Sequence, residues 1–260
     1  LLEWYKVLAL ELAKARPNVV VACGNEALQA LCGVSGITTY RGSILPSSLV
    51  PGLKVIPLLH PSYILKKALW QELFVSSWFV HDKVVPQSLF PEIRYEPWTE
   101  FVDPSQAELD LLGEELYAEQ CPWSLDIETN RKDKITHVGF AWGQLGQEKA
   151  VCMPTYELPP DDWFWHWLQE LINNNPFITG HNFFYDMAWL KTYGVTVPHV
   201  WMDSIIAFHR LYPELPKKLA FASMLFTDIS WYKGEGKDWT KKARYNIKDC
   251  VAQIRVVHRT

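Results

Sequence analysis

The stretch "SLDIETN", residues 124–130, ends an apolar, strand-like run with two acids one residue apart. Residues i and i+2 of a strand lie on the same side, so Asp126 and Glu128 are predicted to point in one direction. Two carboxylates held this close are unfavourable unless a cation or a shared proton accompanies them. The D-x-E triplet occurs once in the sequence, and about one occurrence is expected by chance, so its meaning depends on partners elsewhere.

The composition is that of a globular protein. The chain has 260 residues, enough for one large domain or two ordinary ones, and 48% of them are hydrophobic. The sequence holds no run of about 18 apolar residues, so a membrane span is not expected. The five cysteines form no C-x-x-C pair, which indicates reduced thiols in a cytosol-like compartment. Because the sequence begins with Leu1 and lacks a basic n-region, we expect a fragment boundary and no signal peptide.

Charge is divided unevenly along the chain. Residues 1–85 hold 8 Lys/Arg and 5 Asp/Glu, a balance of +3, whereas residues 86–260 hold 17 and 24, a balance of −7. Passive nucleic-acid binders are normally basic, so the acidic part is not expected to be one. Its charge is compatible with a carboxylate site that needs divalent metal before it approaches phosphate groups.

A proline-rich stretch, residues 84–104, divides the chain and is predicted to be an extended linker. Before it, residues 1–83 have the pattern of a small α/β module, and after it residues 105–260 form a larger α/β domain. In the module, caps and periodicity predict helices at 1–16 and 24–33, with Gly33 closing the second, a buried strand at 18–23, a strand at 54–59 and a long amphipathic stretch at 62–83.

The larger domain is predicted to begin with a helix, with Asp103 as its N-cap and Pro104 as its first residue. Strands are expected near 123–127, 135–142, 149–153 and 177–179, and helices near 161–174, 183–193, 203–211, 216–226 and 240–257.

Two further residue pairs accompany the two acids of the opening stretch. Asn182 and Asp186 are four residues apart, as are Tyr245 and Asp249, and each spacing of these residue types occurs once in the sequence. Residues i and i+4 lie on one face of a helix. The acids come from elements far apart in sequence that can converge in the fold. An isolated acid is most often a solvated surface residue, but three rare pairs in this order are harder to dismiss.

Together these motifs resemble those of the DEDD exonucleases, in the subtype that contains a tyrosine: "DIE" (126–128), "NFFYD" (182–186) and "YNIKD" (245–249). More narrowly, residues 105–260 look like the 3′→5′ proofreading domain of bacterial and phage family A DNA polymerases, because "WMDSIIAFHRLYPELPKKLAFASMLFTD" (201–228) reads like the segment before the third motif. The resemblance implies a ribonuclease-H-like fold with a mixed central sheet. It also implies a cytoplasmic location in a bacterial or phage-infected cell and a polymerase domain beyond Thr260.

The resemblance further implies a two-metal mechanism. Two divalent ions about 3.5–4 Å apart neutralise charge, activate water and support the departing oxygen. Mg²⁺ or Mn²⁺ prefers oxygen ligands, which four carboxylates supply. Asp126 would bridge both ions, Glu128 and Asp249 would complete the site of the nucleophilic water, and Asp186 would hold the second ion. Tyr245 would orient that water, because a phenol with a pKa of about 10 is a poor base.

The expected partner is DNA with a single-stranded or frayed 3′ end. Asn182 is expected to position the substrate or the helix of Asp186, and Ile127 and Thr129 are expected to contact nucleic acid beside the first-motif acids. The basic residues before the third motif either steer DNA or solvate a surface: Lys241, Lys242 and Arg244.

Other conspicuous residues have a functional and a structural interpretation. Trp163, Trp165 and Trp167 could stack bases, but their helical spacing favours the core. Asp203 could be a further metal ligand, yet its place before an apolar run suits a helix N-cap better. His181 adjoins the second motif and either touches substrate or is a structural histidine.

Residues 1–83 resemble the C-terminal half of uracil-DNA glycosylases of the iron–sulfur type, in "VVVACGNEALQALCG", "GITTYRGSIL" and "VIPLLHPSYILKKA". The family's N-terminal active-site motif would lie before Leu1, and its four cluster cysteines have no match. We therefore expect neither uracil excision nor an iron–sulfur cluster, but a degenerate module that docks DNA or supports the exonuclease. Arg41 and His60 are its expected DNA-facing side chains; alternatively Arg41 forms a surface ion pair and His60 turns the chain.

Three functions remain open at this point: a DNA exonuclease that edits for a polymerase, a ribonuclease-D-like RNA exonuclease with the same metal site, and a non-catalytic DNA-binding module. The segment "PELPKKL" (213–219) and the glycosylase-like neighbour favour DNA. A decayed exonuclease is expected to have lost a motif acid, and all four are present.

Overall fold

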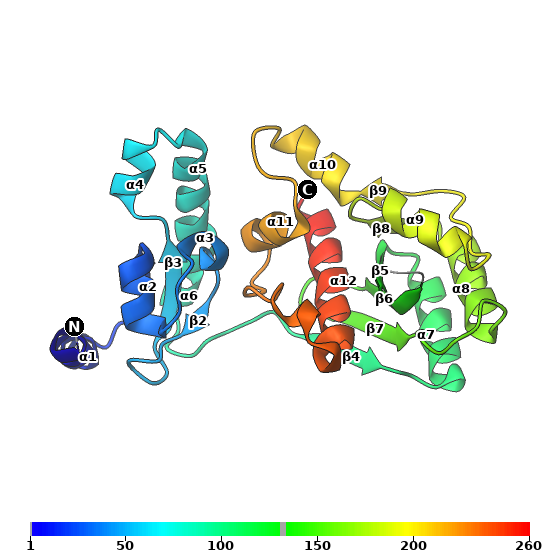
Figure 1. Cartoon of the computed structure of the whole chain (residues 1–260), viewed down its shortest axis with the longest axis horizontal. Coiled ribbons are helices and arrows are strands. Elements are labelled where there is room, and N and C mark those ends of the chain that lie inside the picture. The colour runs from blue at the N-terminus through cyan, green and yellow to red at the C-terminus, as the bar shows by residue number, and fades with distance from the viewer. Residues whose placement is uncertain (1, 131–133) are drawn as a thin grey trace. The chain divides into compact units, whose positions relative to one another are not determined.

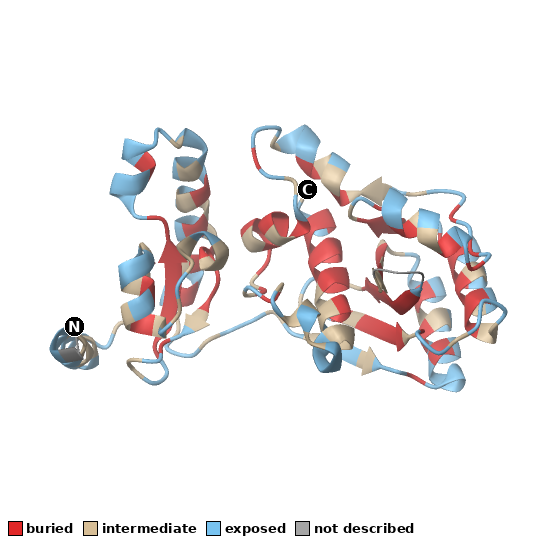
Figure 2. Cartoon of the chain, viewed as in Figure 1, coloured by how far each residue is buried: buried red, intermediate tan, exposed pale blue. Residues whose placement is uncertain are grey.

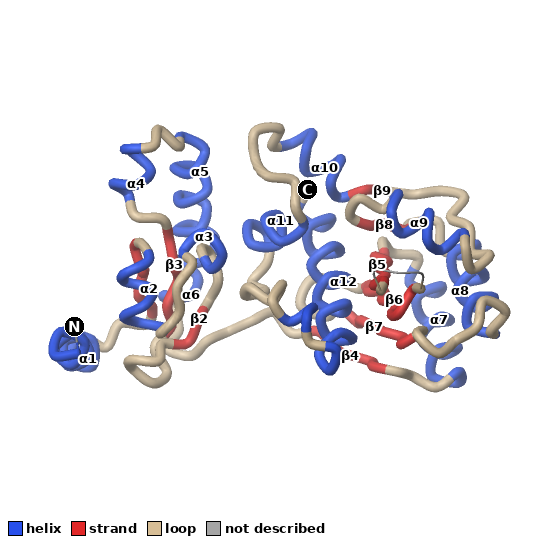
Figure 3. Tube along the Cα trace, viewed as in Figure 1, coloured by secondary structure: helices blue, strands red, loops and turns tan. Residues whose placement is uncertain are grey.

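The computed structural model describes residues 2–130 and 134–260 and divides the chain into two compact units (Figures 1 and 3). Unit 1 is formed by Leu1–Tyr95 with the short segment Thr227–Trp231, and unit 2 by Glu96–Phe226 with Tyr232–Thr260. In the described ranges, the helices are too short or too polar to cross a membrane.

Unit 2 is built on a six-stranded mixed sheet. Its strand order is β4 (Trp98–Val102), β7 (Glu148–Pro154), β6 (Ile135–Trp142), β5 (Trp123–Thr129), β8 (Ile178–Gly180) and β9 (Met202–Asp203). Strand β6 runs antiparallel to both of its neighbours, and the other neighbouring pairs are parallel. The expected α/β fold with a mixed central sheet is confirmed.

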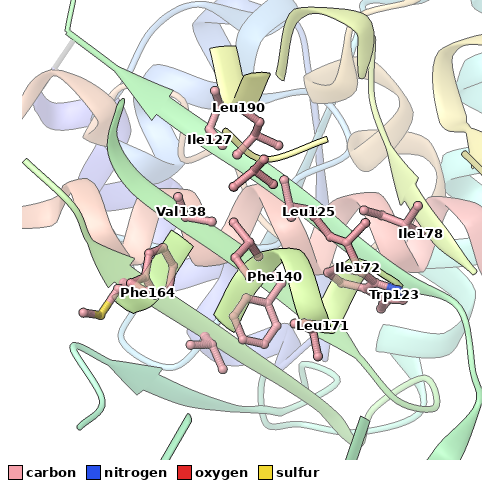
Figure 4. Packing of buried hydrophobic residues seen from close by; sticks show 14 of the residues in the cluster. Trp123, Leu125, Ile127, Val138, Phe140, Phe164, Leu171, Ile172, Ile178 and Leu190 are labelled. Atoms are coloured by element: carbon pink, nitrogen blue, oxygen red, sulfur yellow. The ribbon is translucent and has the colours of Figure 1, made fainter. Parts of the chain in front are cut away.

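The pleat of β5 divides apolar from polar side chains. Trp123, Leu125 and Ile127 are buried in the hydrophobic core (Figure 4). That core also takes residues from α7 (Gln106–Glu119), α8 (Trp163–Asn174) and α9 (Phe184–Lys191). The alternate residues Asp126 and Glu128 point to the opposite face, as the period of two in a strand requires. The paired acids therefore lie on one side of the sheet, as predicted.

Helix α12 (Lys242–Arg259) covers the polar face, packing on β5, β6 and β7, with α10 (Ser204–Leu211) and α11 (Leu219–Phe226) beside it. Figure 2 shows this helix as a largely buried element. Its fully buried Arg255 donates from Nε and Nη2 to the buried Glu148 of β7, at 2.6 and 3.0 Å. A bidentate pair of this kind fixes the angle and depth of α12 on the sheet.

The helix expected to start at Asp103 and Pro104 starts two residues later, at Gln106. Asp103 is not a helix N-cap but has a left-handed backbone with φ of 53°. Helix α7 is instead capped by Ser105, whose hydroxyl accepts the Glu108 backbone N–H while the Glu108 carboxylate accepts the Ser105 N–H. The S-x-x-E capping box is visible in the sequence and satisfies two otherwise free donors.

The linker expected over 84–104 is not an extended connection. It begins with the helical turn α6 (Val85–Ser88) and contains β4, the edge strand that pairs with β7. The fully buried Lys54 holds this stretch by donating its ammonium group to three of its backbone carbonyls, those of Gln87, Phe90 and Glu92. A buried cation must be solvated by the protein, so these carbonyls are held in place around it.

Unit 1 contains a three-stranded sheet in the order β1 (Val19–Cys23), β3 (Lys54–Leu58) and β2 (Leu45–Pro46). Strand β3 is buried throughout, whereas β1, expected to be buried, is half-buried and ends in an exposed Cys23. The first three helices of the described chain are α1 (Leu2–Ala15), α2 (Asn25–Cys32) and α3 (Ile37–Tyr40). Gly33 closes α2 with φ of 69°, as predicted.

The amphipathic stretch expected at 62–83 is not one helix. It is broken into α4 (Pro61–Lys66), α5 (Trp70–Phe79) and a π-helical turn at Val80–Val84. The break between α4 and α5 includes Ala68, which has a left-handed backbone with φ of 48°. A right-handed helix cannot contain this conformation.

Gly139 of β6 allows the close approach of α12, and its substitution tests this packing. A Cβ there would lie 2.1 Å from Asn246 Oδ1 and 2.8 Å from Cys250 Sγ. We expect Gly139→Ala to lower the free energy of unfolding by about 1–3 kcal/mol, because the helix must shift. The measurement is urea unfolding combined with hydrogen exchange of β6 and α12.

The matched control is Gly234→Ala, where φ is −70° and the added Cβ meets nothing within 4 Å among the described residues. Equal unfolding midpoints for the two variants would contradict the assigned packing.

Candidate active site

Three carboxylates converge where α12 crosses the sheet. Asp126 and Glu128 come from β5 and Asp249 from α12, and each offers an oxygen within 4.8 Å of the others. The first two are half-buried and Asp249 is buried. Asp249 lies 123 residues after Asp126 and 121 after Glu128, and it reaches them because the polar face of β5 is the face that α12 covers.

The fourth predicted acid joins them from helix α9. Asp186 lies in the first turn of α9 and is buried, and its Oδ1 accepts the backbone N–H of Ile127 at 2.9 Å. This bond ties α9 to the residue between the two strand acids. The charge of Asp186 is close enough to raise the pKa of Asp126. The structure therefore brings together all four acids that the motifs predicted.

Two amides on α12 hold Asp126. Asn246 Nδ2 donates to Asp126 Oδ2 at 2.8 Å, and Gln253 Nε2 donates to Asp126 Oδ1 at 2.9 Å. Both residues are buried, and neither was predicted as part of the site. The sequence carried a usable signal, because Asn246, Asp249 and Gln253 are spaced i, i+3 and i+7 and so form one stripe of the helix.

Two lysines place positive charge against the acids. The ammonium group of Lys242 pairs with Glu128, and that of Lys233 pairs with Asp249. Lys233 also donates to the Tyr245 hydroxyl at 3.2 Å, and the buried Tyr232 hydroxyl donates to Asp249 Oδ1 at 2.5 Å. Lys242 was expected only to steer DNA or solvate a surface, and Lys233 and Tyr232 were missed, since they lie in an irregular stretch outside the motifs.

The acids carry more negative charge than their surroundings balance. Burial, followed by the charges of Asp249, Asp186 and Glu128, raises the pKa of Asp126 well above its usual value. Burial also raises the pKa of Asp186 to about 7. The pKa of Glu128 is raised by burial as well, although Lys242 opposes the shift. Such shifts express the cost of holding carboxylates together in a desolvated site.

This donor set fits divalent metal ions of the hard class. The ligand atoms are carboxylate oxygens, the kind that Mg²⁺ and Mn²⁺ prefer. A bound cation would also remove the unfavourable charge that raises the pKa values of the acids. Asp126, Glu128, Asp186 and Asp249 are the residues that would hold such ions.

Tyr245 lies one helical turn before Asp249 and is half-buried beside the acids. Burial raises its pKa far above the usual value for a phenol, and the charge of Asp249 adds to the shift. The hydroxyl is therefore protonated at neutral pH, so it can orient a water molecule by hydrogen bonding but cannot act as a strong base.

The expectation that Asn182 shares a helix face with Asp186 is wrong. Asn182 precedes α9, is exposed and has a left-handed backbone with φ of 58°. The turn is held by Asp203, which accepts the backbone N–H groups of Asn182 and Phe183 at 3.0 and 2.9 Å. Asp203 also caps α10 through the N–H of Ile205, as predicted.

The other residues predicted beside the site have structural contacts. The side chain of Ile127 is buried in the core and so is turned away from the face that carries the acids. Thr129 Oγ1 lies 2.9 Å from the Tyr185 hydroxyl at the end of β5. His181 Nδ1 bonds the Ser204 hydroxyl at 2.9 Å. The three tryptophans of α8 join the core, as favoured, with Trp165 buried and the other two half-buried against it: Trp163 and Trp167.

In unit 1, the two side chains expected to face DNA have different environments. Arg41 is buried, and its guanidinium pairs with the Glu72 carboxylate at 2.5 Å, so it does not face outward. His60 is exposed and acts as the N-cap of α4, its Nδ1 accepting the Ser62 N–H at 3.1 Å. Arg41 thus forms an ion pair, but a buried one and not the surface pair that was considered, and His60 starts the helix that follows the strand.

The chain was compared with known proteins. No protein-family model matches it, and no curated protein matches it. The catalytic core of RRP6 from Trypanosoma brucei is a similar solved structure, at 18% identity and a TM-score of 0.49, over 64% of this chain and 49% of that one. The chain thus spans about half the length of the RRP6 core.

Two other solved structures are similar. The Aedes aegypti Nibbler EXO domain is 10% identical with a TM-score of 0.48, over 61% of this chain and 85% of that one. The EXD2 exonuclease domain soaked in Mg and GMP is 16% identical with a TM-score of 0.33, over 61% and 87%. Structural similarity this weak says nothing about activity. Any argument about activity must come from the carboxylate site.

Metal binding to the four acids is expected to stabilise the chain. At a free ion concentration about 100 times the dissociation constant, the gain is about 2.7 kcal/mol, which corresponds to a rise in Tm of roughly 5 °C. The measurement is thermal unfolding with Mg²⁺ or Mn²⁺ and with EDTA. Asp126→Ala is expected to lose the rise, and an equal rise in that variant would contradict the assignment.

The same measurement has a predicted pH dependence. The pKa of Asp186 in the folded chain, about 7, lies above its unfolded value, so the folded state binds the extra proton. This contribution to stability is present at pH 4 and is lost as the pH rises through 7. Metal should therefore raise Tm more at pH 8 than at pH 6.

Proposed function

We propose that this chain is a metal-dependent 3′→5′ exonuclease that hydrolyses the terminal phosphodiester of a nucleic-acid strand. The observation that supports the proposal is the convergence of Asp126, Glu128, Asp186 and Asp249 from a strand and two helices, with Tyr245 one turn before the last acid. The motif order and the ribonuclease-H-like fold are those implied by the resemblance to DEDD exonucleases.

When bound, two divalent ions supply charge neutralisation, an activated water and support for the departing oxygen. The residues of the chain organise that chemistry. Asn246 and Gln253 fix both oxygens of Asp126, which gives this carboxylate a defined orientation toward its neighbours. The protonated Tyr245 orients the attacking water. Lys233 and Lys242 keep positive charge where the substrate phosphate would lie.

For the substrate we propose DNA, edited at single-stranded or frayed 3′ ends, with a family A polymerase domain as the partner. The support is the segment "PELPKKL" (213–219), which reads like that of the proofreading domains, and the glycosylase-like character of residues 1–83. The metal site itself suits RNA equally, so RNA cleavage is an outcome of the test below. For the module over 1–83 we propose a supporting role without uracil excision.

A non-catalytic binding module is disfavoured by the state of the site. Four buried or half-buried acids are costly to hold together and contribute nothing to a passive nucleic-acid surface. If the acids had no function, random mutation would be expected to replace at least one of them. The acids, the amides that orient Asp126 and the tyrosine are all present.

Digestion of end-labelled strands tests the proposed reaction. We expect shortening from the 3′ end with release of 5′-mononucleotides in Mg²⁺ or Mn²⁺, and none in excess EDTA. Single strands and mismatched ends should be cut faster than paired ends, because the terminal base must leave the duplex. Parallel DNA and RNA substrates decide the sugar. Digestion in EDTA, or shortening from the 5′ end alone, would contradict the proposal.

Substitutions are expected to rank the site residues. Asp126→Ala should be the most damaging, followed by Asp249→Ala and Glu128→Ala. Asp186→Ala should be partly rescued by high Mn²⁺. Tyr245→Phe removes a hydroxyl but no metal ligand, so we expect a loss on the order of 10²-fold with metal binding intact.

The measurements for this ranking are single-turnover cleavage and calorimetric metal titration. Asp110→Asn is the matched control, because Asp110 is exposed on α7, away from the face that α12 covers. Asp203→Asn is less suitable as a control, since Asp203 holds the turn before α9. Near-wild-type cleavage by Asp126→Ala, or loss of metal binding in Tyr245→Phe, would show that the roles are assigned wrongly.

A further inference from the structure

Three aromatic rings form a cluster on unit 2. The Trp239 ring lies 5.3 Å from the His137 ring and 5.4 Å from the Tyr156 ring, measured between centroids, and both contacts are edge-on. The rings come from β6, from the turn after β7 and from the 3-10 turn Trp239–Lys241. We call Trp239 and Tyr156, with His137 beneath them, the aromatic platform.

The aromatic platform adjoins the carboxylates. His137 is the residue directly opposite Glu128 in the antiparallel pair of β5 and β6. Directly opposed residues point to the same face, with Cβ atoms about 4.5–5.5 Å apart. Three residues after Trp239, Lys242 pairs with Glu128. The platform therefore adjoins Glu128, one of the predicted metal ligands, through His137 and through the chain that leads to Lys242.

Exposure differs sharply within the platform. His137 is 4% exposed, whereas Trp239 is 54% exposed and Tyr156 is 42% exposed. His137 anchors the group, since its Nδ1 lies 3.1 Å from the Thr136 hydroxyl, which in turn donates to the Glu128 carbonyl. The neighbours of such a ring already restrict its side-chain conformations, while much of its surface is still in contact with water. A ligand that covers the ring therefore gains burial of apolar surface and loses little side-chain entropy.

We propose that Trp239 and Tyr156 stack a nucleobase of the single strand whose terminal phosphodiester lies at the carboxylates. This rests on the proposed nuclease function and adds a base-binding site to it. Aromatic side chains grip unpaired strands without regard to sequence, because every base presents a π face. A platform next to the metal ligands would hold the strand within reach of cleavage while the terminal base changes.

Charge around the platform suits a nucleic-acid strand better than an apolar partner. Lys241 and Arg244 are exposed, and within the described part of the chain their ion pairs are long, with Asp238 at 3.5 Å and with Glu100 at 3.6 Å. Exposed ion pairs of this kind are weak, so these cations can exchange their partners for phosphate oxygens at little cost. The bases would contact the rings and the backbone would follow the cations.

The test is a binding cycle between one ring and one base. Fluorescence anisotropy measures the affinity of labelled oligothymidylate and oligouridylate in EDTA, where cleavage is absent. Each of the terminal nucleotides is replaced in turn by an abasic one. In the wild-type chain, one abasic position should weaken binding about tenfold. In Trp239→Ala, binding should already be about tenfold weaker, and that abasic position should cost nothing more.

The controls separate stacking from folding and from the nuclease function. Trp239→Phe should retain most of the affinity, and Trp201→Ala, which removes a partly exposed tryptophan that contacts Phe177, should retain all of it. The proposal is overturned if the abasic cost is the same in Trp239→Ala as in the wild type, or if Trp239→Ala binds like Trp201→Ala. Affinity is measured without cleavage, so the two proposals can fail separately. If the chain binds bases at Trp239 but does not digest the strands, the nuclease function is disproved and the base-binding site is retained.

Discussion

The arrangement of unit 2 depends on placing like charges under a helix. Asp126, Glu128 and Asp249 lie where α12 crosses the sheet, and desolvation there opposes their ionisation. The surrounding groups reduce that cost in two ways: Asn246 and Gln253 donate to one carboxylate, and Lys233 and Lys242 pair with the others. A purely structural interface would be more stable with apolar residues in these positions. The acids are present despite the free energy that their desolvation and mutual repulsion cost, which indicates that they serve a function and do not stabilise the fold.

The site requires both faces of β5 to be specified by one short sequence. Trp123, Leu125 and Ile127 anchor the strand in the core, and the residues between them carry the acids. A slip of one residue would exchange the two sets and bury the acids in the apolar layer. The backbone N–H of Ile127 adds a second use of the same strand, because it holds Asp186 and with it the first turn of α9.

The regular parts of this architecture follow from the sequence because period and capping determine them. The core strands β5, β6 and β7 and the helix of the third motif lie where hydrophobic spacing places them. Three of the motif acids cluster as their order implies, and the fourth, Asp186, bonds the strand residue between two of them. The parts that could not be predicted depend on tertiary contacts. Lys54 draws the proline-rich stretch into unit 1, and pairing with β7 turns residues near its end into a strand. Lys233 and Tyr232 reach Asp249 from an irregular segment whose path no periodicity encodes.

One helix connects nearly all the chemistry that has been assigned to this site. Lys242, Asn246, Asp249 and Gln253 follow one another at intervals of four, three and four residues, so they form a single stripe that faces the acids of β5, and Tyr245 adjoins this stripe one turn before Asp249. Rotation of α12 by one residue, about 100°, would turn the stripe away from β5. The buried pair of Arg255 and Glu148 opposes such a rotation from the far end of the helix, and Gly139 lets the near end approach closely. The position of the acids under α12 is therefore set in part by packing at residues outside the motifs, such as Arg255, Glu148 and Gly139.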